Sequence, residues 1–169
     1  MRKVTYIITT CLLMTFLFVG ISHASDSVGS DTSFPVPRFI SLGADEVNVR
    51  VGPGIRYPIK FVLKKEYLPV EVTKEFDVWR EVQTIDGDKG WVHKSLLSGR
   101  RMVIIKDYTQ TIYKDPNADA KPIVKLEPGV IARLSSCTKN WCQLKVASYK
   151  GWIEKDSIWG VYPDEIVKK

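Results

Sequence analysis

Few side chains in this 169-residue chain have the chemistry of a catalytic site. The histidines are His23 and His93, and the cysteines are Cys11, Cys137 and Cys142. A cysteine peptidase needs a free cysteine beside a histidine, and a hydrolytic zinc needs three protein ligands. His23 and Cys11 lie in an N-terminal segment that we expect to be removed. The carboxylate pairs that could act in catalysis, at residues 45–46 and at residues 86 and 88, lie in or beside predicted turns. We therefore predict a protein that is not an enzyme and that uses no cofactor and no metal.

The two remaining cysteines are separated by four residues. Cys137 and Cys142 flank a predicted turn between two strands, and in an exported protein the default interpretation is a disulfide across that hairpin. Two free thiols are the alternative. A metal site is not favoured, because two cysteines without a nearby histidine give too few ligands.

The N-terminus has the pattern of a signal peptide. Arg2 and Lys3 precede an uncharged, mostly apolar run over residues 4–21, and small residues at Ser22 and Ala24 predict cleavage after Ala24. A retained transmembrane anchor is the alternative, because the run is about long enough to cross a bilayer. Cleavage predicts a periplasmic or extracellular protein with no stable membrane insertion, and lowers the formal net charge from +6 to +4.

Residues 25–37 are rich in serine, aspartate, glycine and proline, which predicts a disordered linker. From residue 38 onward the pattern changes to short β-type runs. Apolar residues alternate with polar ones over residues 47–51, 68–73 and 78–83, and turn signals recur every 8–12 residues. Residues 38–99 are therefore expected to form a small β-barrel or sandwich of five or six strands.

The same pattern returns about 61–63 residues later. Trp79 is followed at this offset by Trp141, and the tripeptide at residues 90–92 (Gly-Trp-Val) by the one at residues 151–153 (Gly-Trp-Ile). Residues 100–160 are thus predicted to be a second copy, followed by a tail over residues 161–169. The short connection at residues 98–101 predicts that the two barrels touch each other. The copies differ at one loop, where residues 52–54 (Gly-Pro-Gly) have no counterpart in residues 114–119.

Two motifs resemble those of bacterial SH3-like domains. They are N-V-R-x-G-P-G-x-x-Y-P over residues 48–58 and G-W-V-H-K-S-L-L over residues 90–97. The closest resemblance is to the type common in exported alphaproteobacterial proteins. It implies an all-β chain with two tandem SH3-like barrels. Relatives of this family often bind peptidoglycan stems or bridges, or position a neighbouring enzyme.

The strand period places Trp79 and Trp141 on the polar face of their strands, where each is either a lid over a neighbouring loop or a platform for a ligand. SH3 domains grip extended peptides with an aromatic groove that includes a tryptophan at the start of this strand. In that register His93 and Leu96 replace the usual proline and tyrosine, which disfavours proline-rich ligands. The candidate binding residues are Arg50, Arg56, Tyr57, Trp79, His93 and Trp141.

The leading hypothesis is a non-catalytic module that binds peptidoglycan or its stem peptides at the cell envelope. The alternative is an adaptor that recognises an extended segment of an envelope protein. Nucleic acid is not predicted as a partner, because no run of lysine and arginine is long enough for a nucleic-acid arm.

Overall fold

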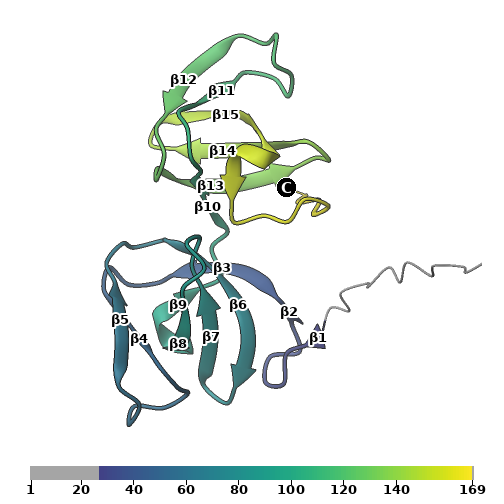
Figure 1. Cartoon of the computed structure of the whole chain (residues 1–169). Coiled ribbons are helices and arrows are strands. Elements are labelled where there is room, and N and C mark those ends of the chain that lie inside the picture. Colours follow the sequence, from purple (N-terminus) through teal and green to yellow (C-terminus); the bar gives the residue numbers. More distant parts are fainter. Residues whose placement is uncertain (1–26, 169) are drawn as a thin grey trace, which may run out of the picture.

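The computed structural model describes residues 27–168 and contains two small β-barrels that follow each other along the chain (Figure 1). The first barrel is built from β3 (Arg38–Leu42), β4 (Val47–Arg50), β5 (Ile59–Leu63), β6 (Pro69–Phe76), β7 (Trp79–Gln83), β8 (Lys89–His93), the 3₁₀ turn η1 (Lys94–Leu96) and β9 (Leu97–Ser98). The second is built from β10 (Met102–Ile105), β11 (Gln110–Tyr113), β12 (Pro122–Leu126), β13 (Ile131–Cys137), β14 (Trp141–Val146), β15 (Tyr149–Glu154), η2 (Lys155–Ser157) and β16 (Ile158–Trp159). The all-β prediction with two tandem SH3-like barrels is confirmed.

The two sheets have the same topology. The strand order is β5-β4-β8-β7-β6-β3-β9 in the first sheet and β12-β11-β15-β14-β13-β10-β16 in the second, so each strand has a counterpart at the same place. The register shifts are also shared. They fall after Val49 and Val72 in the first barrel and after Ile112 and Leu134 in the second. The internal duplication inferred from the tryptophan spacing is therefore a structural duplication.

Each barrel encloses its own core of aliphatic side chains. In the first barrel the buried valines of β4, β6, β7 and β8 pack on Leu42. In the second, Ile112, Leu144 and Ile153 occupy the corresponding strands, and Cys137 and Cys142 join them. The two cysteines form a disulfide with both residues buried, as their spacing predicts.

The segment before the first barrel differs from our expectation. We expected a disordered linker over residues 25–37, but from Ser27 onward it is ordered against the barrel. β1 (Ser27–Val28) pairs with β2 (Pro35–Val36) in a small hairpin, which we call the N-terminal arm, and Val36 is buried in the first core. The composition of this segment predicted disorder because it cannot show the contact that orders the arm. That contact is with Glu75, which lies about forty residues away in the sequence.

The Glu75 carboxylate accepts hydrogen bonds from the N-terminal arm and from the first barrel. The donors are the backbone N–H of Asp31 and Thr32, the Thr32 hydroxyl and the Arg38 guanidinium, with Arg38 Nη2 at 2.6 Å. Arg80 Nε lies 3.3 Å from the same carboxylate, whose side chain is fully shielded from solvent. Burial opposes ionisation, but the hydrogen bonds from Thr32, Arg38 and Asp31 lower the pKa of Glu75 to about 2.

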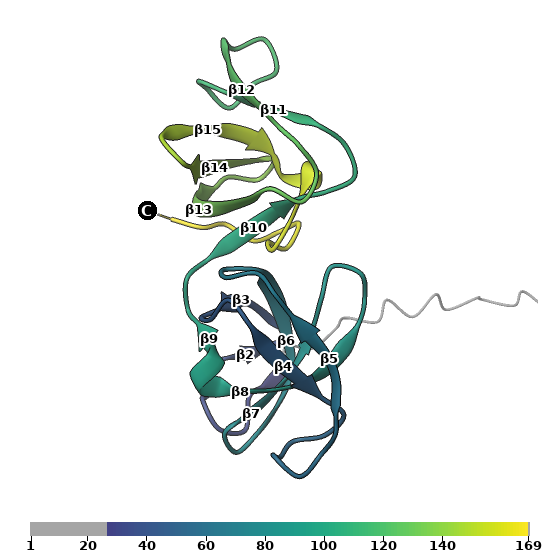
Figure 2. The same cartoon turned by 90° about the vertical axis from the view of Figure 1, so that its left-hand side faces the viewer.

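The barrels are in contact, as their short connection predicts. Both views show β3 on the side of the first barrel that faces the second (Figures 1 and 2). The ring of Phe39 in β3 lies 4.9 Å from that of Trp159 and 4.8 Å from that of Tyr162. Tyr162 Oη donates to Glu71 of β6 across the interface at 2.8 Å. Burial, the Glu71 hydrogen bond and the nearby negative charge together raise the pKa of Tyr162.

The C-terminal segment, residues 160–168, runs back along the second barrel. Arg101 donates two hydrogen bonds to the Glu165 carboxylate, at 2.6 and 3.0 Å, and Val167 pairs with Cys137 through both backbone hydrogen bonds. Burial opposes ionisation of Glu165, but the bonds from Arg101 and the N–H of Tyr162 lower its pKa. The tail predicted over residues 161–169 is thus a folded part of the second barrel as far as residue 168.

No helix within residues 27–168 is long and apolar enough to cross a membrane. The predicted signal peptide, residues 1–24, lies outside the described residues.

Candidate functional site

The loop between β4 and β5 is built around Tyr57. A Cβ atom placed on Gly52 would lie 2.5 Å from the Tyr57 ring, so only glycine lets the ring pack at this position. Arg50 Nη1 donates to the Tyr57 carbonyl at 2.7 Å and closes the loop from the other side. The G-P-G-x-x-Y pattern and the preceding arginine therefore have a structural role, and Arg50 orders the loop that follows it.

A groove lies beside this loop, with Trp79 as one wall. Trp79 is opposite His93 on the neighbouring strand, and the two rings meet edge to face at 5.4 Å. His93 is held in place because its Nδ1 accepts from the N–H of Ser95 at the start of η1. We call this hollow of about 240 Å³ the first groove; it is lined by Asn48, Arg50, Ile55, Trp79, His93, Ser95 and Leu96.

Trp79 is more enclosed than its polar strand face indicates. It lies outside the core cluster, yet only 8% of its surface is exposed. Strand alternation places Trp79 on the face opposite Val82, but it cannot show that neighbouring side chains cover the ring and bury it. Trp79 is thus an edge of the groove rather than an open platform.

The second barrel repeats the strand pairing around the tryptophan with different side chains. Tyr113 pairs with Trp152 as Arg50 pairs with Trp91, and Trp141 pairs with Glu154 as Trp79 pairs with His93. Beside Trp141 lies a hollow of about 560 Å³, which we call the second groove. It is lined by Lys139, Asn140, Trp141, Glu154, Asp156, Pro163 and Asp164.

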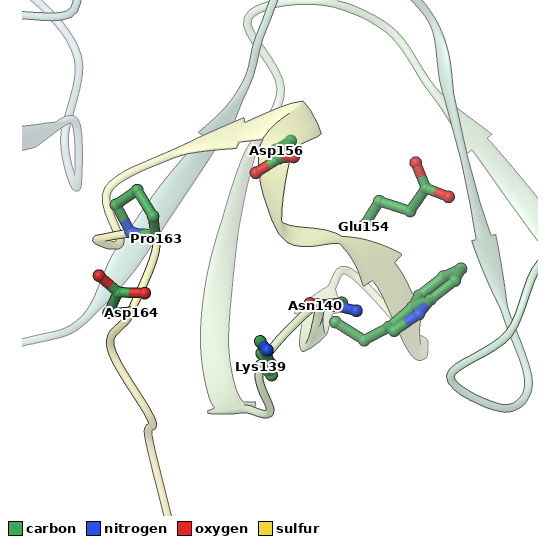
Figure 3. A pocket seen from close by; sticks show the side chains of 7 residues that line it. Lys139, Asn140, Glu154, Asp156, Pro163 and Asp164 are labelled. Carbon is green, nitrogen blue, oxygen red and sulfur yellow. The ribbon is translucent and has the colours of Figure 1, made fainter.

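Three segments contribute to the second groove, as Figure 3 shows. Lys139 and Asn140 come from the β13–β14 hairpin, and Glu154 and Asp156 from the end of β15 and from η2. Asp164 comes from the C-terminal segment, which Lys155 Nζ holds through two backbone carbonyls at 2.9 Å each. The first groove has no counterpart of this third wall.

The two grooves have opposite formal charge. One arginine and no acidic residue line the first groove, whereas three carboxylates and one lysine line the second. The carboxylates of Glu154, Asp156 and Asp164 have no hydrogen-bond or ion-pair partner among residues 27–168. The first groove therefore favours an acidic group on a ligand, and the second favours a basic one.

The structure brings together some of the predicted binding residues and separates others. Arg50, Trp79 and His93 meet in the first groove, and Trp141 lies in the second. Arg56 and Tyr57 do not line either groove. The binding roles of all six residues stay predictions.

Glu154, Asp156 and Asp164 were missed as groove residues. The repeat offset that matches residues 90–92 with residues 151–153 also matches His93 with Glu154, so this signal was present in the sequence. No sequence signal points to Asp164, because the tail has no counterpart in the first copy. The described part of the chain has no group of three side chains suited to holding a metal ion.

Comparison with known proteins places this geometry in a family. The chain is similar to a protein of Bacillus subtilis (strain 168) named "Putative N-acetylmuramoyl-L-alanine amidase YrvJ", with 25% identity over 171 residues. The match covers 94% of this chain and 31% of that relative, so the chain spans about a third of the relative's length.

Two solved structures, NlpC2 and NlpC1 from Trichomonas vaginalis, have TM-scores of 0.35 and 0.34 at 15% identity. They match over 75% and 82% of this chain and 49% and 51% of theirs. A likeness of this size says nothing further about the fold.

The family model described as "Bacterial SH3 domain" matches residues 43–99 and again residues 106–160. These two matches cover each barrel except its first strand, and each contains the tryptophan of one groove. The chain therefore belongs to the bacterial SH3 domain family.

Proposed function

We propose that this protein is a non-catalytic module that binds peptidoglycan, through its stem peptides, at the cell envelope. The observation that carries the proposal is that each barrel has a hollow beside the tryptophan at the start of the same strand. Two sites on one chain suit a polymer that presents the same peptide many times. The similarity to the protein named "Putative N-acetylmuramoyl-L-alanine amidase YrvJ" supports a ligand in the cell wall.

The opposite charges of the grooves refine the proposed ligand. A peptide that carries both carboxylates and free amino groups has partners for both sites. In the first groove Arg50 is available beside an aromatic wall, although one of its donors already holds the loop carbonyl. In the second groove an amino group can approach the Trp141 ring and the carboxylates around it. An N-terminal export signal, as the sequence predicts, would bring the protein to this polymer.

The test is co-sedimentation of the chain from Ser25 with purified, lipid-free peptidoglycan sacculi over a range of salt concentrations. Glu154→Gln is the variant that should disturb the fold least, because the Glu154 side chain is exposed and makes no capping hydrogen bond to η2. We expect weaker binding in Glu154→Gln and in Trp79→Ala, and unchanged binding in Tyr149→Ala, an exposed aromatic that lines neither groove.

The outcomes separate the candidate functions. Binding that persists in salt and falls in both groove variants supports the proposal. Binding that disappears in salt and is the same in both groove variants would contradict the proposal, because it would arise only from attraction between a basic protein and an anionic polymer. The binding result for Trp79→Ala is interpreted only if this variant still unfolds cooperatively, because a variant that has lost its fold would also lose binding. Absence of binding would favour the alternative, an adaptor for an envelope protein, and release of wall fragments by the pure protein would refute the non-catalytic assignment.

A further inference from the structure

The β4–β5 hairpin, residues 47–63, exposes an unusual amount of apolar surface. Its exposed large hydrophobic residues are Val51, Ile55, Tyr57, Ile59 and Val62, five of the thirteen found among the described residues. Ile55 at the tip is 79% exposed and Ile59 is 48% exposed. The loop of this hairpin protrudes at the end of the first barrel that faces away from the second barrel (Figures 1 and 2).

The charged side chains of the hairpin itself all have the same sign. Residues 47–65 include five cationic side chains and no acidic one. Lys64 pairs with Glu46 and Lys65 donates to a carbonyl of the second barrel, so both are already engaged. Arg56, at the loop tip, has no partner within residues 27–168, and exposed Lys60 donates only to the Lys89 carbonyl. Positive charge is thus available beside the exposed apolar side chains.

The corresponding hairpin of the second barrel shows that the fold does not require this surface. Across residues 110–126 one large hydrophobic side chain, that of Ile123, is exposed. The loop there carries Asp115 and Asp119 between Lys114 and Lys121. The two copies, which share one topology, therefore differ in the apolar surface of this hairpin, and the difference indicates a partner that only the first hairpin meets.

We propose that the β4–β5 hairpin docks the protein on the surface of an anionic phospholipid bilayer. A protruding loop with apolar side chains at its tip and cations beside them matches the boundary between acyl chains and headgroups. Ile55, Val51 and Ile59 enter this boundary, and Arg56 and Lys60 contact the anionic headgroups. The protruding position of the loop (Figures 1 and 2) and the absence of an acidic side chain within residues 47–65 favour this partner over a peptide.

The loop is ready for docking without further ordering. The Arg50 guanidinium and the packing of Tyr57 on Gly52 already fix its backbone. The entropy lost on binding is therefore small. Docking of this kind needs no membrane-spanning segment and leaves the second barrel away from the bilayer.

The experiment uses the chain that begins at Ser25, so that the apolar run at residues 4–21 cannot supply the binding; all described elements lie within it. It is floated with vesicles of phosphatidylcholine, with and without an equal amount of phosphatidylglycerol. We expect binding to the anionic vesicles only. The double variant I55S/I59S should need about tenfold more lipid for half-maximal binding, whereas I123S should behave like the unmodified protein. The charge variant R56Q/K60Q should weaken binding more than K114Q/K121Q.

Three results would overturn the proposal. The first is no binding to anionic vesicles by a protein that is folded by circular dichroism. The second is binding that is unaffected by I55S/I59S, because attraction would then arise from the overall positive charge. The third is loss of sacculus binding in I55S/I59S with unchanged vesicle binding, because the hairpin would then serve the first groove, which Ile55 also lines.

Discussion

The buried Glu75 carboxylate should make the first barrel sensitive to acid in a way that one substitution removes. Its pKa is lowered from 4.5 to about 2. A group with a depressed pKa in the folded state contributes stability above its unfolded pKa, and this contribution is lost as the pH falls toward its folded pKa. The contribution of Glu75 is therefore complete above about pH 5 and is lost between about pH 4.5 and 2.

The magnitude follows from that shift. At 1.36 kcal/mol per pKa unit, lowering the pKa from 4.5 to about 2 corresponds to about 3 kcal/mol of folding free energy at neutral pH. Glu75→Gln should cost about the same, because it leaves Arg80, which is 3% exposed, without its counter-ion. Arg80 keeps its bonds to the carbonyls of Asp77 and Trp79, which limits the loss.

Urea unfolding at pH 7 and at pH 3 provides the assay. We expect Glu75→Gln to be less stable at pH 7 by about 3 kcal/mol, and the difference from the unmodified protein to shrink at pH 3. Glu46→Gln is the matched control, because its ion pair with Lys64 is exposed and should contribute less than about 1 kcal/mol. If Glu75→Gln loses as much stability as the unmodified protein between pH 7 and pH 3, the assignment of this acid sensitivity to Glu75 is wrong.

Three other substitutions test separate contacts. Gly52→Ala should displace the Tyr57 ring and cost about 1–3 kcal/mol, measured by thermal unfolding, whereas Gly54→Ala, where the nearest ring atom would be 3.4 Å away, should be nearly neutral. Cys142→Ser should lower the free energy of unfolding by at least about 2 kcal/mol from loop entropy alone, and intact protein should take up no thiol label before reduction. Tyr162→Phe removes a hydrogen bond to a carboxylate between the barrels and should cost about 1.5–3 kcal/mol; equal stability with and without the hydroxyl would show that the aromatic contacts alone hold the interface.

The sequence alone was sufficient to predict the architecture. Alternating valines around Asn48, and a tryptophan and a Gly-Trp pair that recur at nearly the same offset, predict two copies of a short-stranded barrel. The disulfide also follows from local spacing, since Cys137 and Cys142 flank one turn. These features depend on residues close together in the sequence.

What the sequence did not predict depends on distant contacts. The N-terminal arm is ordered by Glu75, and the C-terminal segment is ordered by Arg101 and by the edge of β13. Nothing in the composition of either segment indicates these partners. The same limit applies to the grooves, because strand alternation gives the face of Trp79 but not the side chains that cover it, and Asp164 enters the second groove only through the path of the tail.

The contact between the barrels fixes the distance between the two grooves. Because Phe39, Trp159 and Tyr162 pack at the junction and Lys65 reaches across it, the separation and orientation of the two grooves are set by the fold rather than by a flexible tether. Under the proposed function, a polymer engages both grooves at once only where its peptides recur at that spacing. Loosening the junction would then change which spacings are recognised while leaving the affinity of each groove for a single peptide unchanged.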